Sequence, residues 1–157
     1  MHANEQLIRN FYAAFAARDS DAMGRCYHPE ITFSDPAFPK LSGAEAGAMW
    51  QMLVSRGKDL QITLIDAEAN TAGGSATWEA CYTFSKTGRT VINRIDALFA
   101  FRDGLIIRHI DRFGFWQWSK QALGLPGLLL GWAWPFKAMV RKQAAASLAH
   151  FMGRHAS

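Results

Sequence analysis

Residues 60–113 read LQITLIDAEANTAGGSATWEACYTFSKTGRTVINRIDALFAFRDGLIIRHIDRF, and this stretch decides the fold. Four segments of it are rich in Ile, Thr, Val, Phe, Tyr and Trp, the residues that favour strands. These segments are 60–68, 75–85, 90–102 and 105–113. Each link between them is short, turn-like and contains glycine, and short links join neighbouring strands antiparallel. We therefore predict a meander of four long strands.

Helical patterns precede this meander. Apolar residues recur at helical spacing, and Ser, Asp and Glu stand where helix caps are expected. The patterns predict a helix over 4–18, a short helix over 22–27 that Pro29 ends, a short strand over 31–33, and a helix ending near Arg56 that Ser42 and Glu45 cap. Helices followed by a run of strands indicate an α+β fold with the helices on one face of a sheet.

The chain ends in an unusual segment. Residues 115–136 hold four of the six tryptophans, and glycines and prolines divide them into pieces. Residues 136–152 form an amphipathic pattern typical of a helix. This helix either closes over the core or a dimer partner, or it lies on a membrane surface, since tryptophan with basic residues and no acids is typical of interfacial helices. We divide the chain into a domain over 1–118 and a Trp-rich linker with its helix over 119–157.

Composition excludes several classes of protein. The 157 residues are 50% hydrophobic and 19% charged, which fits one globular domain and excludes general disorder. Residues 112–157 carry six basic and no acidic side chains, so the net charge of +4 belongs to the tail and does not indicate a nucleic-acid-binding domain. Cys26 and Cys81 are interpreted as reduced core thiols, and no Cys/His spacing fits a metal. With no secretory signal and no apolar run of membrane-spanning length, we expect a cytoplasmic protein.

Strand alternation sorts the candidate site residues. Helices packed on a curved sheet can form a cone around a pocket, and polar side chains that point into it are candidates. Arg94 and Asp96 share one face of their strand, His109 and Asp111 share one face of the last strand, and Asp35 ends a strand before Pro36. Each has a purely structural alternative. Asp35 can begin a turn, Arg94 can pair with Asp96 or Asp111, and His109 can be a hydrogen-bonded core histidine.

A resemblance adds to this interpretation. The opening helix contains FYAAF (11–15) and Arg18-Asp19, and HPEITFSDP (28–36) follows it. Arg94-Ile95-Asp96, DGLI (103–106) and Asp111-Arg112-Phe113 come later. In this order, over roughly residues 5–118, the motifs resemble the NTF2-like superfamily, in particular its SnoaL-like and ketosteroid-isomerase-like branch. The resemblance implies an NTF2-like (cystatin-like) α+β cone, commonly a homodimer, with a deep apolar pocket.

The ketosteroid-isomerase pattern implies one set of roles. Its general base is an Asp in an Asp-Pro motif, which Asp35 matches, and its second Asp is a protonated donor to an oxyanion, which Asp96 matches. The tyrosine of its first helix corresponds here to Phe11, which cannot donate a hydrogen bond, and Tyr12 is one residue away.

Two other branches of the superfamily imply different sets of catalytic residues. Limonene-epoxide hydrolase uses an Asp-Arg-Asp set that Arg94, Asp96 and Asp111 match, but Phe33 and Asp35 stand where it has a water-positioning Tyr and Asn. SnoaL-type cyclases need an acid/base Asp, a role open to Asp111 with His109 beside it.

From these matches we expect a small apolar ligand with a carbonyl or an epoxide and acid/base chemistry without a cofactor or metal. The functions left open are isomerisation or cyclisation, epoxide hydrolysis, and non-catalytic ligand binding or dimerisation.

Overall fold

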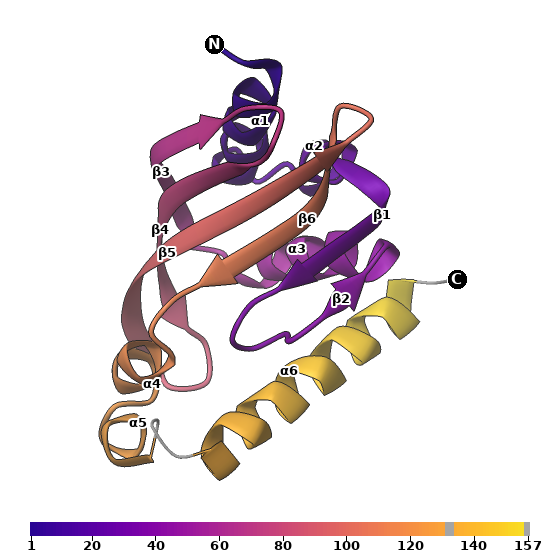
Figure 1. Ribbon diagram of the computed structural model, residues 1–157. Helices are drawn as coiled ribbons and strands as arrows, with labels where there is room; N and C mark the ends of the chain where they lie inside the picture. Colours follow the sequence, from indigo (N-terminus) through magenta and orange to yellow (C-terminus); the bar gives the residue numbers. More distant parts are fainter. Residues whose placement is uncertain (131–133, 156–157) are drawn as a thin grey trace.

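The computed structural model describes residues 1–130 and 134–155, and it has an α+β architecture (Figure 1). Three helices pack on one face of a six-stranded sheet, as predicted. The helices are α1 (Ala3–Ala16), α2 (Ser20–Arg25) and α3 (Ala44–Arg56). The strands are β1 (Tyr27–Ser34), β2 (Leu41–Ser42), β3 (Gln61–Ala69), β4 (Gly74–Phe84), β5 (Arg89–Arg102) and β6 (Leu105–Arg112).

The sheet has the order β2-β1-β6-β5-β4-β3. The strands β3 to β6 pair antiparallel in sequence order, which confirms the predicted meander. The strand β1 pairs with β6 in parallel, which the sequence did not predict. The central position of β6, between β1 and β5, places its inward side chains in the middle of the helix-covered face.

The interpretation of Pro29 was wrong. The helix α2 already ends at Arg25, and β1 runs through Pro29 instead of beginning at Ile31. The pairing of β1 with β6 shifts its register between Tyr27 and Thr32. A proline lacks the N–H that a regular strand ladder needs, so it is tolerated where the ladder is interrupted.

The first helix supplies most of the aromatic core. Ile8, Phe11, Tyr12 and Phe15 of α1 are all buried, and their spacing places them on one helical face. The ring of Phe11 stacks on that of Tyr27 of β1, with the two centroids 5.3 Å apart. The centroid of Phe11 also lies 5.2 Å from that of Tyr12, in an edge-to-face arrangement. The helix therefore fixes a layer of aromatic rings against the inner face of the sheet.

The cap of α3 differs in part from its prediction. Gly43, with φ +58°, is the N-cap residue, and no side chain caps the helix there. Glu45 Oε1 accepts a hydrogen bond from the backbone N–H of Ser42 at 3.1 Å, which is half of the predicted capping box.

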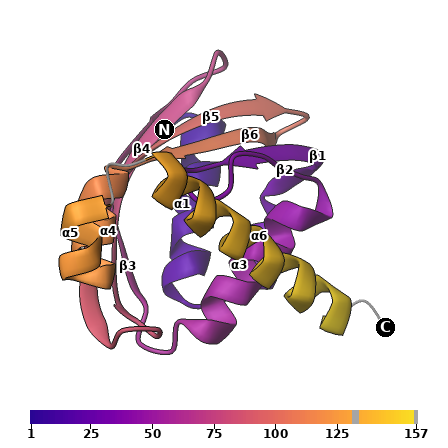
Figure 2. The ribbon, with the colours of Figure 1, turned by 90° about the horizontal axis from the view of Figure 1, so that it is seen from below.

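Three further helices follow the sheet. They are α4 (Phe115–Leu123), α5 (Leu125–Leu130) and α6 (Trp134–His155). Figure 2 shows α6 running across the molecule and over α3. Leu148 and Phe151 of α6 are buried, so the apolar stripe of this helix faces the protein, as in the first of the two alternatives. No helix within residues 1–130 and 134–155 is long and apolar enough to cross a membrane.

The docking of α6 can be tested by substitution. Leu148→Glu places a charge where an apolar side chain is buried, and burying an unpaired charge is costly. We expect α6 to undock and trypsin to cleave after Lys137, Arg141 or Lys142 about tenfold faster, since undocked segments open more readily. The matched control is Ala149→Glu at the neighbouring exposed position, and equal cleavage rates in the two variants would contradict this packing.

Candidate functional site

A chain of buried hydrogen bonds begins on the inward face of β6. Asp111 and His109 are buried, and Asp111 Oδ1 lies 2.8 Å from His109 Nε2. His109 Nδ1 lies 2.8 Å from Tyr27 Oη of β1, and Trp50 Nε1 of α3 donates to the same Tyr27 oxygen at 2.8 Å. Trp78 Nε1 of β4 also donates to Asp111 Oδ1, at 3.4 Å. Four elements thus contribute to one connected polar group.

One arrangement of hydrogens satisfies every member of this chain. Tryptophan can only donate, so Tyr27 Oη accepts from Trp50. In this arrangement, the hydrogen of Tyr27 is directed to His109 Nδ1. A neutral imidazole that accepts at Nδ1 carries its hydrogen on Nε2, and it donates that hydrogen to Asp111. The surroundings are apolar, with the rings of Phe33 and Phe99 centred 5.1 and 4.5 Å from the imidazole. His109 is therefore a hydrogen-bonded core histidine, the structural alternative considered above.

Asp35 lies in the turn after β1. Its Oδ1 accepts from the backbone N–H groups of Ala37 and Phe38, at 2.7 and 2.6 Å, so it does begin a turn. The residue as a whole keeps partial exposure, but its carboxyl group lies deep enough that burial raises its pKa to about 7. Burial is the largest cause, and the charge of Asp111 also raises the pKa, whereas the two backbone hydrogen bonds and Arg141 lower it. A carboxyl group with this pKa can take up or release a proton near neutral pH.

Tyr82 of β4 interacts electrostatically with Asp35. Burial raises the pKa of Tyr82, the hydrogen bond from Trp118 lowers it, and the charge of Asp35 raises it. Tyr82 Oη accepts from Trp118 Nε1 of α4 at 2.8 Å, which leaves the tyrosine's own hydrogen available for donation. Ile62 and Leu64 of β3 share the inward side of the sheet with Tyr82, and all three are only partly buried. This part of the inner face is incompletely covered.

Arg141 connects α6 to the turn of Asp35. Its Nε donates to the backbone oxygen of Pro36 at 2.9 Å, and its positive charge lowers the pKa of Asp35. We predict that Arg141→Gln raises the pKa of Asp35 above its value of about 7, because the guanidinium charge is lost. Carboxyl carbon shifts followed by NMR against pH measure this. Lys142→Gln, at the neighbouring exposed position, is the control, and an equal effect of both variants would contradict a specific role of Arg141.

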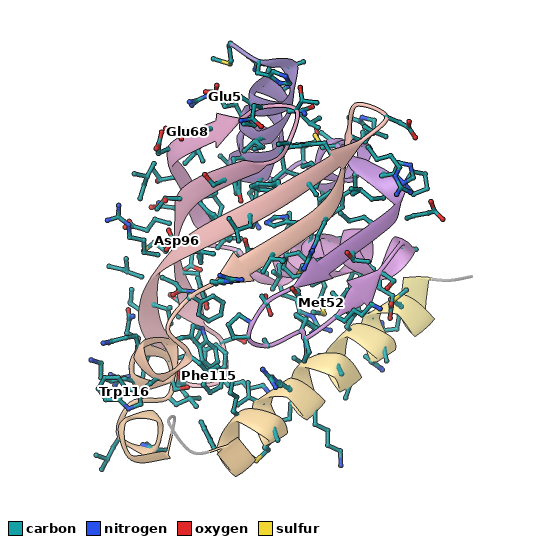
Figure 3. The ribbon with its side chains drawn as sticks, viewed as in Figure 1. Glu5, Met52, Glu68, Asp96, Phe115 and Trp116 are labelled. Carbon is teal, nitrogen blue, oxygen red and sulfur yellow. The ribbon has the colours of Figure 1, made fainter. Side chains whose placement is uncertain are left out.

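The placement expected for Asp96 and Arg94 was wrong. Both side chains are exposed, and Asp96 accepts a hydrogen bond from Thr77 Oγ1 at 3.1 Å on the outer side of the sheet (Figure 3). The side chains of β5 alternate, and the face that carries Asn93, Ile95 and Phe99 is buried. Asp35 and Asp96 therefore do not meet in one pocket. Arg94 and Asp96 also lie on the opposite side of the sheet from Asp111, so the Asp-Arg-Asp set does not assemble.

The deep pocket stays a prediction. A hollow of about 570 Å³ lies between α2, α3 and the end of α6, and it is lined by small and polar residues with Phe151 and Met152. None of the candidate site residues lines it. A second hollow, of about 420 Å³, lies at the β3–β4 turn, also away from the site residues. No group of three or more potential metal ligands occurs in the part of the chain that the structure describes.

Comparisons with known proteins identify the family. The model of the SnoaL-like domain matches residues 8–109. The chain belongs to the SnoaL-like family. Its fold is that of NTF2-like and ketosteroid-isomerase-like proteins, as the resemblance implied. A comparison with curated protein sequences gives no match.

Three solved structures show what this SnoaL-like chain is similar to. The LEH-like epoxide hydrolase of M. tuberculosis is 16% identical, with a TM-score of 0.65, and the match covers 82% of this chain and 96% of that one. A protein of ketosteroid-isomerase-like fold from Catenulispora acidiphila is 15% identical, with a TM-score of 0.67 and coverages of 77% and 94%. IdmH of Streptomyces antibioticus, described as a candidate polyketide cyclase, is 20% identical, with a TM-score of 0.66 and coverages of 79% and 100%.

The SnoaL-like match contains only part of the site. It includes Asp35, Tyr82 and His109, but it ends before Asp111, and Trp118 and Arg141 lie well beyond it. Tyr27, Trp50 and Tyr82 were not among the candidate residues predicted from the sequence. For Tyr82, the alternation of β4 places it on the same face as Trp78, which was the available signal. Tyr27 was missed because the parallel pairing of β1 with β6 was not predicted.

Proposed function

We propose that this SnoaL-like protein binds a small apolar molecule with a carbonyl or an epoxide and transfers a proton on it through Asp35, in an isomerisation or a cyclisation. The observation that carries the proposal is the carboxyl group of Asp35, which has a pKa of about 7 and interacts electrostatically with Tyr82 on the incompletely covered part of the inner face. A general acid or base is most effective when its pKa lies near the working pH. The apolar side chains of Ile62 and Leu64 favour an apolar ligand there.

In this mechanism the Asp35 carboxylate removes a proton from the carbon next to a carbonyl. Negative charge then develops on the carbonyl oxygen and needs a hydrogen-bond donor. Tyr82 is the donor that the geometry favours, because its oxygen already accepts from Trp118 and its hydrogen has no acceptor among the described residues. The protonated Asp35 returns its proton to a second carbon in an isomerisation. The Coulomb interaction with Asp111 raises the pKa of Asp35 and so favours the protonated form that must donate.

The test uses a β,γ-unsaturated cyclic ketone and limonene oxide as probes, with conversion followed by absorbance and gas chromatography. We expect Asp35→Asn to lower turnover by about 10²–10⁴-fold, the usual contribution of a general acid or base. Tyr82→Phe should lower it by about 10²-fold or more through loss of the oxyanion donor. Asp96→Asn is the control, because that carboxylate lies on the outer side of the sheet, and it should leave turnover unchanged.

Ligand binding without turnover would overturn the proposed catalysis and favour the non-catalytic binding module. One observation favours that second function: the buried polar group of Asp111, His109 and Tyr27 is already satisfied by internal hydrogen bonds. Equal loss of turnover in Asp96→Asn and Asp35→Asn would also contradict the assignment of Asp35.

The homodimer stays a prediction. The sheet face turned away from the helices carries exposed Ile92 and Leu98 on β5, and a second copy of the chain is the occupant we expect there. Sedimentation velocity of the wild type and of Leu98→Glu measures the oligomeric state.

A further inference from the structure

Apolar side chains are exposed at one end of the molecule. Figure 1 shows α4, α5 and the first turns of α6 together, opposite the N-terminus. Leu125 is 66% exposed and Met139 is 47% exposed, and Trp116 is exposed as well (Figure 3). No residue of α5 is charged. We refer to the surface formed by Trp116, Lys120, Leu125, Lys137 and Met139 as the α4–α6 surface.

Positive charge surrounds these apolar side chains. Lys120 Nζ lies 4.6 Å from the ring centroid of Trp116, and Lys137 Nζ lies 5.5 Å from that of Phe115. The β4–β5 hairpin adds Arg89, whose Nε donates to the backbone oxygen of Gln121 at 2.8 Å, and Lys86, which donates to Gln143 Oε1 at 3.4 Å. The sequence has no acidic residue after Asp111 to offset these charges.

We propose that the α4–α6 surface docks on the surface of a membrane that contains anionic lipid. Lysines whose ammonium groups lie over aromatic rings can place their charge in the headgroup layer, while tryptophan and leucine enter the boundary with the acyl chains. Each basic residue near an anionic leaflet adds attraction. The apolar stripe of α6 remains packed on the protein in this arrangement, so docking needs no unfolding of that helix.

Charge argues against a second copy as the occupant. A symmetric dimer brings the same patch of both copies together. A dimer through the α4–α6 surface would place Lys120 and Lys137 against their own counterparts without acidic partners from this segment. An anionic bilayer supplies the opposite charge that the surface lacks.

The test is co-sedimentation of the full chain with vesicles of phosphatidylcholine alone and of phosphatidylcholine mixed equally with phosphatidylglycerol. We expect the protein to sediment with the mixed vesicles, to stay in the supernatant with the neutral ones, and to be released as salt rises. Leu125→Glu should weaken binding to the mixed vesicles by about tenfold or more, because a buried leucine contributes more than 1.4 kcal/mol, the equivalent of tenfold in affinity.

The matched control is Ile65→Glu, which makes the same kind of change at another exposed apolar residue, on β3. It should bind as the wild type does, and circular dichroism establishes that both variants fold. Three results would each overturn the proposal: equal recovery in the supernatant with and without anionic vesicles, wild-type binding by Leu125→Glu, or equal weakening by Ile65→Glu. A fourth result would also overturn the proposal: a dimer, detected by sedimentation velocity without lipid, that Leu125→Glu dissociates.

Discussion

Replacing His109 with alanine should lower the free energy of unfolding by about 3–5 kcal/mol, measured by urea denaturation at neutral pH. The substitution removes the hydrogen bonds to Asp111 and to Tyr27, at 2.8 Å each. It leaves the buried Asp111 carboxylate with the longer bond from Trp78, at 3.4 Å, and leaves the hydrogen of Tyr27 without an acceptor. It also opens a cavity among the rings of Phe33 and Phe99, which adds to the cost.

The control for this experiment is Arg108→Ala on the same strand. Arg108 is exposed, and surface substitutions of this kind usually change stability by no more than about 0.5 kcal/mol. A loss below about 1 kcal/mol in His109→Ala would show that the hydrogen bonds of His109 do not stabilise the fold.

Asp35→Asn should gain stability relative to the wild type as pH rises from about 4 to about 7. In the folded protein the pKa of Asp35 is about 7, above the ordinary 3.8 of an unfolded chain. The folded state therefore holds a proton that the unfolded state releases, and the free energy of unfolding falls as pH rises through this range, by at most about 1.4 kcal/mol per unit. Asparagine does not ionise, and its oxygen can still accept from Ala37 and Phe38.

The measurement is urea denaturation of both proteins between about pH 4 and pH 8. We expect the stability difference to move in favour of asparagine by about 2 kcal/mol, less than the full linkage because Asp35 is partly exposed. Asp59→Asn is the control: hydrogen bonds from Thr83 lower the pKa of Asp59, so this carboxyl group is ionised in both the folded and the unfolded state above about pH 5. The difference in stability between the wild type and Asp59→Asn should therefore stay constant from about pH 5 to pH 8. A difference between wild type and Asp35→Asn that is constant with pH would show that Asp35 titrates normally.

Local sequence patterns predicted most of the secondary structure. The spacing of Ile8, Phe11 and Phe15 defines α1, and the alternation along 90–102 defines β5, because both patterns are local and match the period of one element. The C-terminal helix was predicted for the same reason. The short helices α4 and α5 were not, since glycine and proline interrupt the apolar pattern there.

The site was harder to predict because it depends on contacts between distant elements. Tyr27 and His109 are 82 residues apart, and their hydrogen bond requires the parallel pairing of β1 with β6. Alternation separated the faces of β5 correctly but did not say which face was inside. The resemblance to ketosteroid isomerase favoured the face of Asp96, whereas the apolar Ile95 and Phe99 mark the opposite one as buried. For deciding which face of β5 is buried, two large apolar side chains are therefore stronger evidence than a two-residue motif.

The hydrogen-bond chain of Asp111 has one further consequence. Its outer members, Trp50 and Trp78, are indoles, and an indole N–H donates a hydrogen bond but does not ionise. A proton that reached Asp111 from a ligand would thus find no exit to bulk water along this route. In the proposed mechanism, the exchange of protons with solvent therefore takes place at Asp35, whose pKa of about 7 lies near neutral pH.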